Sequence, residues 1–160
     1  MRQRIEKTTL FFPWLVVADS KDVLGYAYAG PHRERSAYRW STDVTVYLHQ
    51  DARRKGIGTA LYTAILELLR IQGFHRAYAG IALPNPGSVR LHEKMGFRSI
   101  GIYHGVGYKL GTWHDVQWME ATLRSGNEDP QDPISVDQID SAKWRTTISD
   151  GEKVLGQVAF

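Results

Sequence analysis

The spacing of apolar residues changes along the first half of the chain from a strand-like to a helix-like period. Residues 14–19 (WLVVAD) and 23–30 (VLGYAYAG) are rich in branched and aromatic side chains and are joined by a turn-forming Ser-Lys-Asp, which predicts a β-hairpin. Residues 42–48 (TDVTVYL) alternate polar and apolar positions, as in a strand with one buried face. From Ile57 the apolar residues recur at helical spacing, which predicts a helix that ends at Gly73.

The second half continues the alternation of strands and helices. Residues 77–83 predict a buried strand, and residues 88–95 predict a short helix that Ser88 caps. Residues 97–106 and 113–123 are two further strand candidates, separated by the segment GYKLGT. An order of strand, helix, strand, helix and strand is typical of a mixed α/β sheet, which is the fold class that we predict.

The composition changes near Arg124. Residues 125–142 are acidic, contain two prolines and have few large apolar side chains, which predicts a linker. Residues 143–160 predict a β-hairpin with its turn at Asp150-Gly151. This tail loosely repeats the first hairpin around the tripeptide VLG, and we interpret the similarity as chance rather than duplication. We therefore predict a folded domain over residues 1–124, a linker and a tail.

Composition restricts the function classes. The chain has 160 residues, of which 42% are hydrophobic, and a net charge of only +3, so we expect one globular domain and no extended nucleic-acid-binding patch. Cysteine is absent, which excludes disulfides, thiolate metal sites and a cysteine nucleophile. The early apolar stretch LFFPWLVVA is about half of the ~20 residues that span a bilayer. We predict a soluble, cytoplasmic protein without a metal or a membrane partner.

Residues 53–58 (RRKGIG) place three cations and two glycines at the start of the helix that begins at Ile57. A helix start leaves four N–H groups unpaired and carries about half a positive charge, so it attracts anions. Glycines let a phosphate approach the backbone, which predicts a phosphate or pyrophosphate site. The alternative is a glycine-containing turn with a solvated basic rim. The fingerprints of P-loop and dinucleotide-binding proteins are not matched.

This loop and three further blocks resemble the GNAT superfamily of N-acetyltransferases. The pattern Arg-x-x-Gly-x-Gly in residues 53–58 is similar to the acyl-CoA pyrophosphate loop, and residues 85–97 (NPGSVRLHEKMGF) to the second signature. Residues 38–48 (YRWSTDVTVYL), 83–97 and 107–118 (GYKLGTWHDVQW) resemble the phosphinothricin and methionine sulfoximine N-acetyltransferases. The similarity covers roughly residues 2–123.

The resemblance implies a fold, a reaction and a cofactor. We expect a mixed, largely antiparallel central sheet flanked by helices, with acetyl-CoA as co-substrate. The expected reaction is direct transfer of acetyl to the amino group of a small amino-acid-like acceptor such as phosphinothricin or methionine sulfoximine, and relatives often form homodimers.

The beginning of the chain departs from that family. Residues 1–8 read as the last turns of a helix, and the strand and one or two helices that usually open the family are not matched, so we expect an N-terminally shortened domain. The alternative function is a truncated, non-catalytic module that binds CoA or a partner.

The resemblance also implies which residues bind the cofactor. The family holds the CoA pyrophosphate on the loop before the helix, and holds the pantetheine chain through the main chain of the preceding strand, whose N–H groups polarise the thioester. An asparagine before the short helix belongs to the second signature. The matching residues here are Val46, Tyr47, Leu48, Arg53, Arg54, Lys55, Gly56, Ile57, Gly58 and Asn85.

Three residues are catalytic candidates by the same resemblance. An amine attacks only when neutral, so a base is needed. Asp43 matches a position where the subfamily often carries Glu, and would act through a bridging water or on a closer amine; the alternative is an exposed polar residue of a strand. His92 matches the tyrosine with which many members protonate the leaving thiolate, and a surface or packing role is its alternative. His114 approaches the acceptor pocket with the WHDV segment, and we expect it to point inward and Asp115 to point elsewhere.

The acceptor side of the site rests on one short segment. Tyr38, Arg39 and Trp40 match residues that line the acceptor in the family. Arg39 could bind a substrate carboxylate in forked geometry. The alternative is an exposed arginine beside two aromatic residues.

Overall fold

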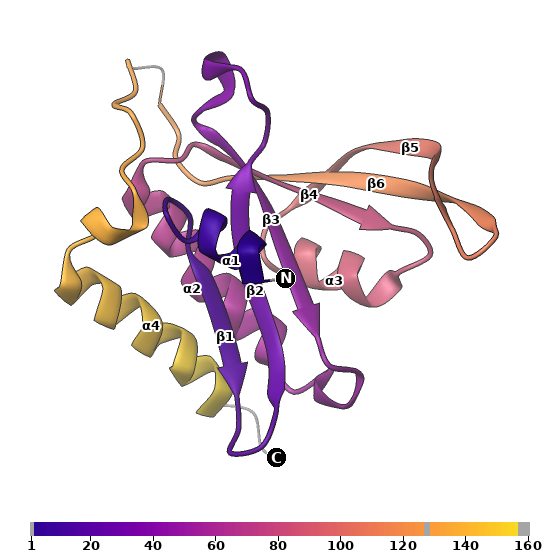
Figure 1. Cartoon of the computed structure of the whole chain (residues 1–160), viewed down its shortest axis with the longest axis horizontal. Coiled ribbons are helices and arrows are strands. Elements are labelled where there is room, and N and C mark those ends of the chain that lie inside the picture. The colour runs from indigo at the N-terminus through magenta and orange to yellow at the C-terminus, as the bar shows by residue number, and fades with distance from the viewer. Residues whose placement is uncertain (1, 127–128, 157–160) are drawn as a thin grey trace.

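A computed structural model describes residues 2–126 and 129–156, and its centre is one six-stranded sheet in the order β1-β2-β3-β4-β6-β5 (Figure 1). Neighbouring strands are antiparallel except β3 and β4, which are parallel. The predicted mixed, largely antiparallel sheet is therefore confirmed. The strands are Trp14–Ala18 (β1), Val23–Pro31 (β2), Ser41–Leu48 (β3), Arg76–Ala82 (β4), Arg98–Lys109 (β5) and Thr112–Thr122 (β6).

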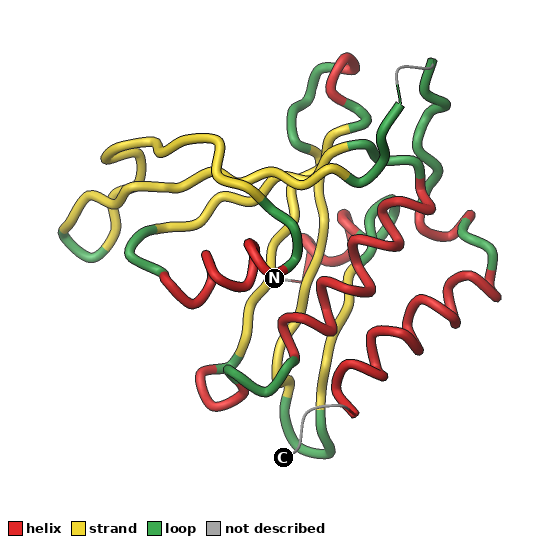
Figure 2. The backbone as a smooth tube through the Cα atoms, turned by 180° about the vertical axis from the view of Figure 1, so that it is seen from behind, coloured by secondary structure: helices red, strands yellow, loops and turns green. Residues whose placement is uncertain are grey.

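Helices cover the sheet unequally. Seen from behind in Figure 2, the two long helices α2 and α4 lie side by side over one face, and the short α1 lies on the other. Within the described residues, no helix is both long and apolar enough to cross a membrane. The helices are Arg2–Thr8 (α1), Ile57–Gln72 (α2), Pro86–Lys94 (α3) and Ser141–Gly156 (α4), with 3-10 turns at Ser36–Tyr38, Gln50–Ala52 and Val136–Gln138.

The core lies between the sheet and α2. Ala27 and Ala29 of β2 have no exposed surface, and their small side chains let the helix approach the sheet closely. Leu61, Ile65 and Leu69, which recur at helical spacing, are buried against them. Each such side chain contributes about 2 kcal/mol when it leaves water, so this one stripe holds α2 in place.

The opposite face of the sheet carries an aromatic row. The rings of Trp14 and Tyr28 stack with centroids 4.3 Å apart, and those of Tyr26 and Tyr47 lie 5.2 Å apart. Arg4 of α1 covers one end of the row, because its Nη2 donates to the Tyr28 hydroxyl at 2.6 Å. Strand residues that point away from α2 therefore share one surface.

The predicted β-hairpin in the tail is wrong, because Ser141–Gly156 forms the helix α4. The carboxylate of Asp140 starts this helix by accepting from the N–H groups of residues 142 and 143 at 3.0 and 3.1 Å. The sequence pattern predicts a turn at Gly151, but a Cβ at this position would lie 3.1 Å from the carbonyl oxygen of Ala60 in α2. The glycine therefore serves close helix packing. Residues 157–160 lie outside the described part of the chain.

The segment before α4 lies against the body of the protein. The backbone N–H of Ile134 donates to the carbonyl of Gln72 at 2.9 Å. In return, the Gln72 amide nitrogen donates to the carbonyls of Phe11 and Ile134, both at 2.8 Å. These bonds fix the chain between the sheet and α4.

Candidate active site

The parallel strands β3 and β4 separate at the middle of the sheet. They pair at only three positions, of which the last joins Asp43 to Tyr78. Beyond this point β3 stays paired with β2 as far as Leu48, and β4 stays paired with β6 as far as Ala82 (Figure 1). Alternate N–H and C=O groups of residues 44–48 therefore have no partner on the β4 side among the described strands, and we call this unpaired stretch the opening between β3 and β4. The predicted pantetheine-binding residues Val46, Tyr47 and Leu48 all lie along it.

The basic loop connects this opening to α2. Arg53, Arg54 and Lys55 are exposed, whereas Ala52 before them is buried and anchors the loop. Gly56 precedes the first helical residue with a φ of +74°, a conformation that favours glycine. Within the described residues, no side chain caps the start of α2, so its first N–H groups point toward the basic loop. This end of the opening attracts an anion.

Gly58 is required by packing. It is buried, and a Cβ there would lie 2.8 Å from Leu91 Cδ2 and 3.3 Å from Leu48 Cδ1. Its lack of a side chain thus lets α3 and β3 close on the first turn of α2. The glycine pattern of the loop combines a conformational need at Gly56 with a steric one at Gly58.

The start of α3 differs from the sequence interpretation. Asn85 caps the helix, because its Oδ1 accepts from the backbone N–H of Ser88 at 3.2 Å. The prediction that Ser88 is the cap is therefore wrong, and the helix begins two residues earlier, at Pro86. Proline suits a first helical position because its missing N–H would have no partner there.

His92 is a core residue at the junction of α2 and α3. It is only 3% exposed, and its Nδ1 lies 2.7 Å from the carbonyl oxygen of Ser88. A carbonyl only accepts, so Nδ1 carries the hydrogen and Nε2 accepts from the Tyr62 hydroxyl at 2.7 Å. Burial lowers the pKa of the His92 imidazole, against the bond to Ser88, which raises it. Both nitrogens are occupied within the protein.

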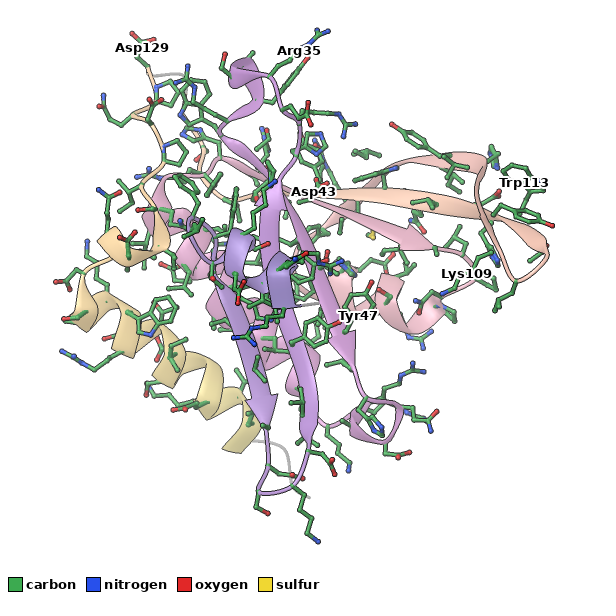
Figure 3. The ribbon with its side chains drawn as sticks, viewed as in Figure 1. Arg35, Asp43, Tyr47, Lys109, Trp113 and Asp129 are labelled. Atoms are coloured by element: carbon green, nitrogen blue, oxygen red, sulfur yellow. The ribbon has the colours of Figure 1, made fainter. Side chains whose placement is uncertain are left out.

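Asp43 lies where β3 and β4 separate, on the sheet face away from α2 (Figure 3). Its neighbours Thr42 and Val44 are buried on the α2 side, which is why its own side chain points to the other face. Its Oδ1 is 2.6 Å from Nδ1 of His32, a residue that the sequence interpretation missed. Burial raises the pKa of the Asp43 carboxyl above its ordinary 3.8, opposed by the hydrogen bond to His32 and by the charges of His32 and Arg33.

Aromatic rings enclose His32. Its imidazole stacks on the ring of Tyr78 with centroids 4.2 Å apart, and the indole of Trp118 meets it edge-on at 6.3 Å. Gly80 of β4 lies opposite Trp118 in the register, and a Cβ there would touch the indole at 3.4 Å, so the glycine leaves room for it. Side chains of the three strands β3, β4 and β6 thus contact His32.

His114 lies on the projecting hairpin of β5 and β6. Its Nε2 is 3.2 Å from the carbonyl oxygen of Lys109, and it does not pair with Asp115, as expected for neighbours on a strand. Asp115 binds His104 at 2.9 Å instead. The sheet register aligns Asp43 of β3 with Tyr78 of β4 and Glu120 of β6. His114 lies six residues from Glu120 on β6, which is about 20 Å along the strand. The structure does not bring these two candidates together.

The acceptor candidates lie beside the segment that precedes α4. Arg39 Nη1 is 3.0 and 3.1 Å from the two carboxylate oxygens of Asp132, and its guanidinium lies 4.7 Å from the Trp40 ring centroid. Trp40 Nε1 donates to the carbonyl of Gln131 at 2.9 Å, and Tyr38 is 45% exposed. Arg39 does bind a carboxylate, but one supplied by the same chain. Among the described residues, no group of three metal-ligating side chains comes together.

Comparison with known proteins identifies the class to which this arrangement belongs. A family model described as "Acetyltransferase (GNAT) domain" matches residues 2–118. The chain belongs to the GNAT acetyltransferase family. It is 46% identical over 106 residues to a phosphinothricin N-acetyltransferase of Streptomyces coelicolor, a match covering 66% of this chain and 62% of the relative. It is 38% identical over 113 residues to an L-methionine sulfoximine/L-methionine sulfone acetyltransferase of Pseudomonas paraeruginosa, covering 70% of this chain and 66% of the relative.

Solved structures agree. A GNAT phosphinothricin acetyltransferase from Sinorhizobium meliloti in complex with AcCoA superposes with a TM-score of 0.75 at 32% identity, covering 86% of this chain and 77% of that one. The chain spans between 55% and 62% of the length of three curated relatives. The fold and the family are therefore shown.

Proposed function

We propose that the chain is an acetyl-CoA-dependent N-acetyltransferase that transfers acetyl directly to the amino group of a small amino-acid-like acceptor. The observation that carries the proposal is the opening between β3 and β4, which has an uncapped helix start and a basic loop at one end and the half-buried Asp43 at the other. Relatives named for acetylating phosphinothricin and methionine sulfoximine make those two compounds the first acceptors to test.

The cofactor would lie along this opening. The pyrophosphate binds at the first turn of α2, next to Arg53, Arg54 and Lys55. The pantetheine chain pairs with the exposed main chain of residues 46–48, as an added strand would. Asn85 uses its Oδ1 to cap α3 and keeps its amide nitrogen to donate to the cofactor. This placement brings the thioester to the point where β3 and β4 meet.

The chemistry needs a proton acceptor for the amine and a donor for the thioester carbonyl. The carboxylate of Asp43 and its partner His32 supply the first at the end of the opening. Main-chain N–H groups of β3 supply the second. We assign His92 a structural role, because both of its nitrogens are bonded inside the core, and we place His114 outside the reacting centre.

Binding of an acceptor carboxylate by Arg39 requires a change of partner. Its guanidinium holds Asp132 in this structure, so a substrate carboxylate would have to displace that side chain. Tyr38 and Trp40 then line the same side.

We further propose that the protein works in the cytoplasm as a homodimer. The β5–β6 hairpin projects from the body (Figure 1). It exposes large apolar side chains that a second copy would cover. These side chains belong to Ile100, Ile102, Tyr103, Val106, Tyr108, Leu110 and Trp113.

Titration calorimetry with acetyl-CoA tests the cofactor site. Gly56→Glu places a negative charge at the helix start and should weaken binding by at least about 10-fold, or 1.4 kcal/mol. Gly56→Asn is the matched control, since asparagine tolerates a positive φ without adding charge. Equal affinity of Gly56→Glu and the wild type would contradict the site. Tight binding without CoA release in the presence of either amine would favour the non-catalytic alternative.

A further inference from the structure

The pair formed by His32 and Asp43 has a defined hydrogen position. Asp43 Oδ1 lies 2.6 Å from His32 Nδ1, and an ionised carboxylate can only accept, so Nδ1 carries the hydrogen. In the neutral imidazole Nε2 then keeps its lone pair. Within the described part of the chain, His32 forms no other side-chain hydrogen bond, so this lone pair remains available. The side chains of His32 and Asp43 are 16% and 35% exposed, which leaves the pair shielded but reachable.

The imidazole is held in one orientation. It stacks on Tyr78, meets the edge of Trp118, and is tethered to Asp43, so contacts from β4, β6 and β3 restrict its rotation. The charged or titratable groups that face it are Asp43, Tyr78 and Arg33, and Arg33 Nη1 also donates to the His32 carbonyl at 3.0 Å. A base that is fixed in this way needs little reorganisation when it receives a proton.

Asp43 is less suited to receive the proton itself. One of its oxygens is already bonded to His32, and its short side chain ends close to the strand. Imidazole is the most common general base in enzymes. The arrangement is that of a general base, His32, whose orientation is fixed by a second group, Asp43.

We propose that His32 is the catalytic base and that Asp43 is its positioning residue, an inference that rests on the proposed acetyl transfer. Nε2 of His32 takes one proton from the acceptor ammonium, and the free amine forms a C–N bond with the thioester carbonyl carbon. The C–S bond then breaks, and the second proton of the nitrogen ends on the CoA sulfur. His32 releases its proton to solvent, so the products are the amide, CoA thiol and one proton.

Steady-state kinetics with acetyl-CoA and phosphinothricin or methionine sulfoximine test this assignment. His32→Asn keeps an N–H that can bond to Asp43 but removes the base, and should lower kcat/KM about 100- to 1000-fold near neutral pH. The variant can acetylate only acceptor molecules whose amine is already unprotonated. Its deficit in kcat/KM relative to the wild type should therefore shrink by up to about 10-fold per pH unit as the pH rises. A deficit in kcat/KM under about 3-fold near neutral pH, or one that stays constant as the pH rises, overturns the proposal.

The chain offers a matched control. His104 forms the same kind of pair with Asp115 on the projecting hairpin, where its side chain is 79% exposed. His104→Asn should leave kcat/KM within about 2-fold of the wild type. An equal loss in His32→Asn and His104→Asn would also overturn the assignment. If His32→Asn does not fold, as judged by circular dichroism, His32→Gln replaces it.

A second measurement separates this inference from the proposed function. Nitrogen-15 NMR of the wild-type protein above neutral pH, with His32 assigned through the backbone, should show a protonated Nδ1 and an unprotonated Nε2. The opposite tautomer overturns the role of His32 whether or not acetyl transfer is found. Absence of turnover with a protonated Nδ1 would instead contradict the proposed function and leave the pair as described.

Discussion

Among the described residues, two histidine–aspartate pairs are hydrogen-bonded through Nδ1, and they have similar geometry but different surroundings. His32 and Asp43 lie 2.6 Å apart where the central strands separate, and their side chains are 16% and 35% exposed. His104 and Asp115 lie 2.9 Å apart on the hairpin, with exposures of 79% and 42%. Figure 3 places Asp43 at the centre of the molecule and Trp113 far from it, near the end of the hairpin. Only the first pair borders the proposed cofactor opening.

The surroundings reverse the effect on the carboxyl group. Burial raises the pKa of Asp43 above its ordinary 3.8. The backbone N–H of Gly105, followed by the bond to His104, lowers the pKa of Asp115. Asp115 thus stabilises an irregular turn of β5, where the register shifts between Tyr103 and Gly107. The same two residue types therefore border the proposed reacting centre in one place and support local structure in the other, according to burial.

The largest expected difference between the pairs is in turnover. Asp43→Asn should lower kcat/KM about 10- to 100-fold, because it removes the charge that orients His32. Asp115→Asn should change it by less than about 2-fold. Steady-state acetylation assays with both variants check this, together with acetyl-CoA affinity, which should not change in either. Similar losses in the two variants would remove the functional distinction between the pairs.

Self-association should depend on the hairpin and not on the His32–Asp43 pair. Trp113 is 66% exposed on the hairpin, and Trp113→Ser should weaken the proposed dimer about 10- to 30-fold if this ring is a central contact. Asp43→Asn should leave the dimer intact. Sedimentation over a concentration series measures both. A wild-type protein that stays monomeric throughout the series would contradict the proposed dimer.

A smaller effect is expected at the turn that Asp115 supports. Gly105 has a φ of +55°, so Gly105→Ala places a side chain in the left-handed region at a cost of about 1 kcal/mol. The melting temperature should fall by roughly 2–4 °C. Gly101→Ala on the same strand is the control, because a Cβ there meets open space. Equal melting temperatures of the two alanine variants would show that the turn at Gly105 contributes nothing to stability.

The smallest expected effect is on the melting temperature, which should depend on pH with opposite sign in Asp43→Asn and Asp115→Asn. A raised pKa means that the ionised Asp43 reduces stability, so Asp43→Asn should melt above the wild type near neutral pH, with the gap closing as the pH falls through the raised value toward 3.8. A lowered pKa means that ionised Asp115 adds stability above 3.8, which is lost as the pH falls through the lowered value. Asp115→Asn should therefore melt below the wild type only at the higher pH values. Thermal scans in a pH series test the two signs, and shifts of the same sign would contradict the comparison.

The sequence predicted the regular elements well where periodicity is strong. The first hairpin, the strand that holds Asp43 and the long helix after the basic loop appear as expected, because each buries one face against a shared core. The tail could not be predicted from its pattern. Its Asp150-Gly151 pair has the composition of a turn, but Gly151 packs closely against Ala60 of α2, a contact between residues far apart in the sequence.

The candidate site was predicted in part. The anion-binding loop follows from residue types and local spacing, whereas Asp43 is a candidate because of the resemblance to the family. The partner His32 depends on the antiparallel register that sets Gly30 opposite Asp43, and on the path of the loop that follows. A close reading of the residue just after the β2 strand could have found it. The burial of His92 depends on Phe97, which follows α3, and on Tyr62 of α2, which lies 30 residues away in the sequence.

The most direct test of the account is a double-mutant cycle on His32 and Asp43, measured as kcat/KM near neutral pH with acetyl-CoA and the better of the two acceptors. If Asp43 acts only through His32, the double variant His32→Asn with Asp43→Asn should lose about as much as His32→Asn alone, within about 3-fold. If the two losses multiply, the residues act independently and His32 is not the base that Asp43 positions.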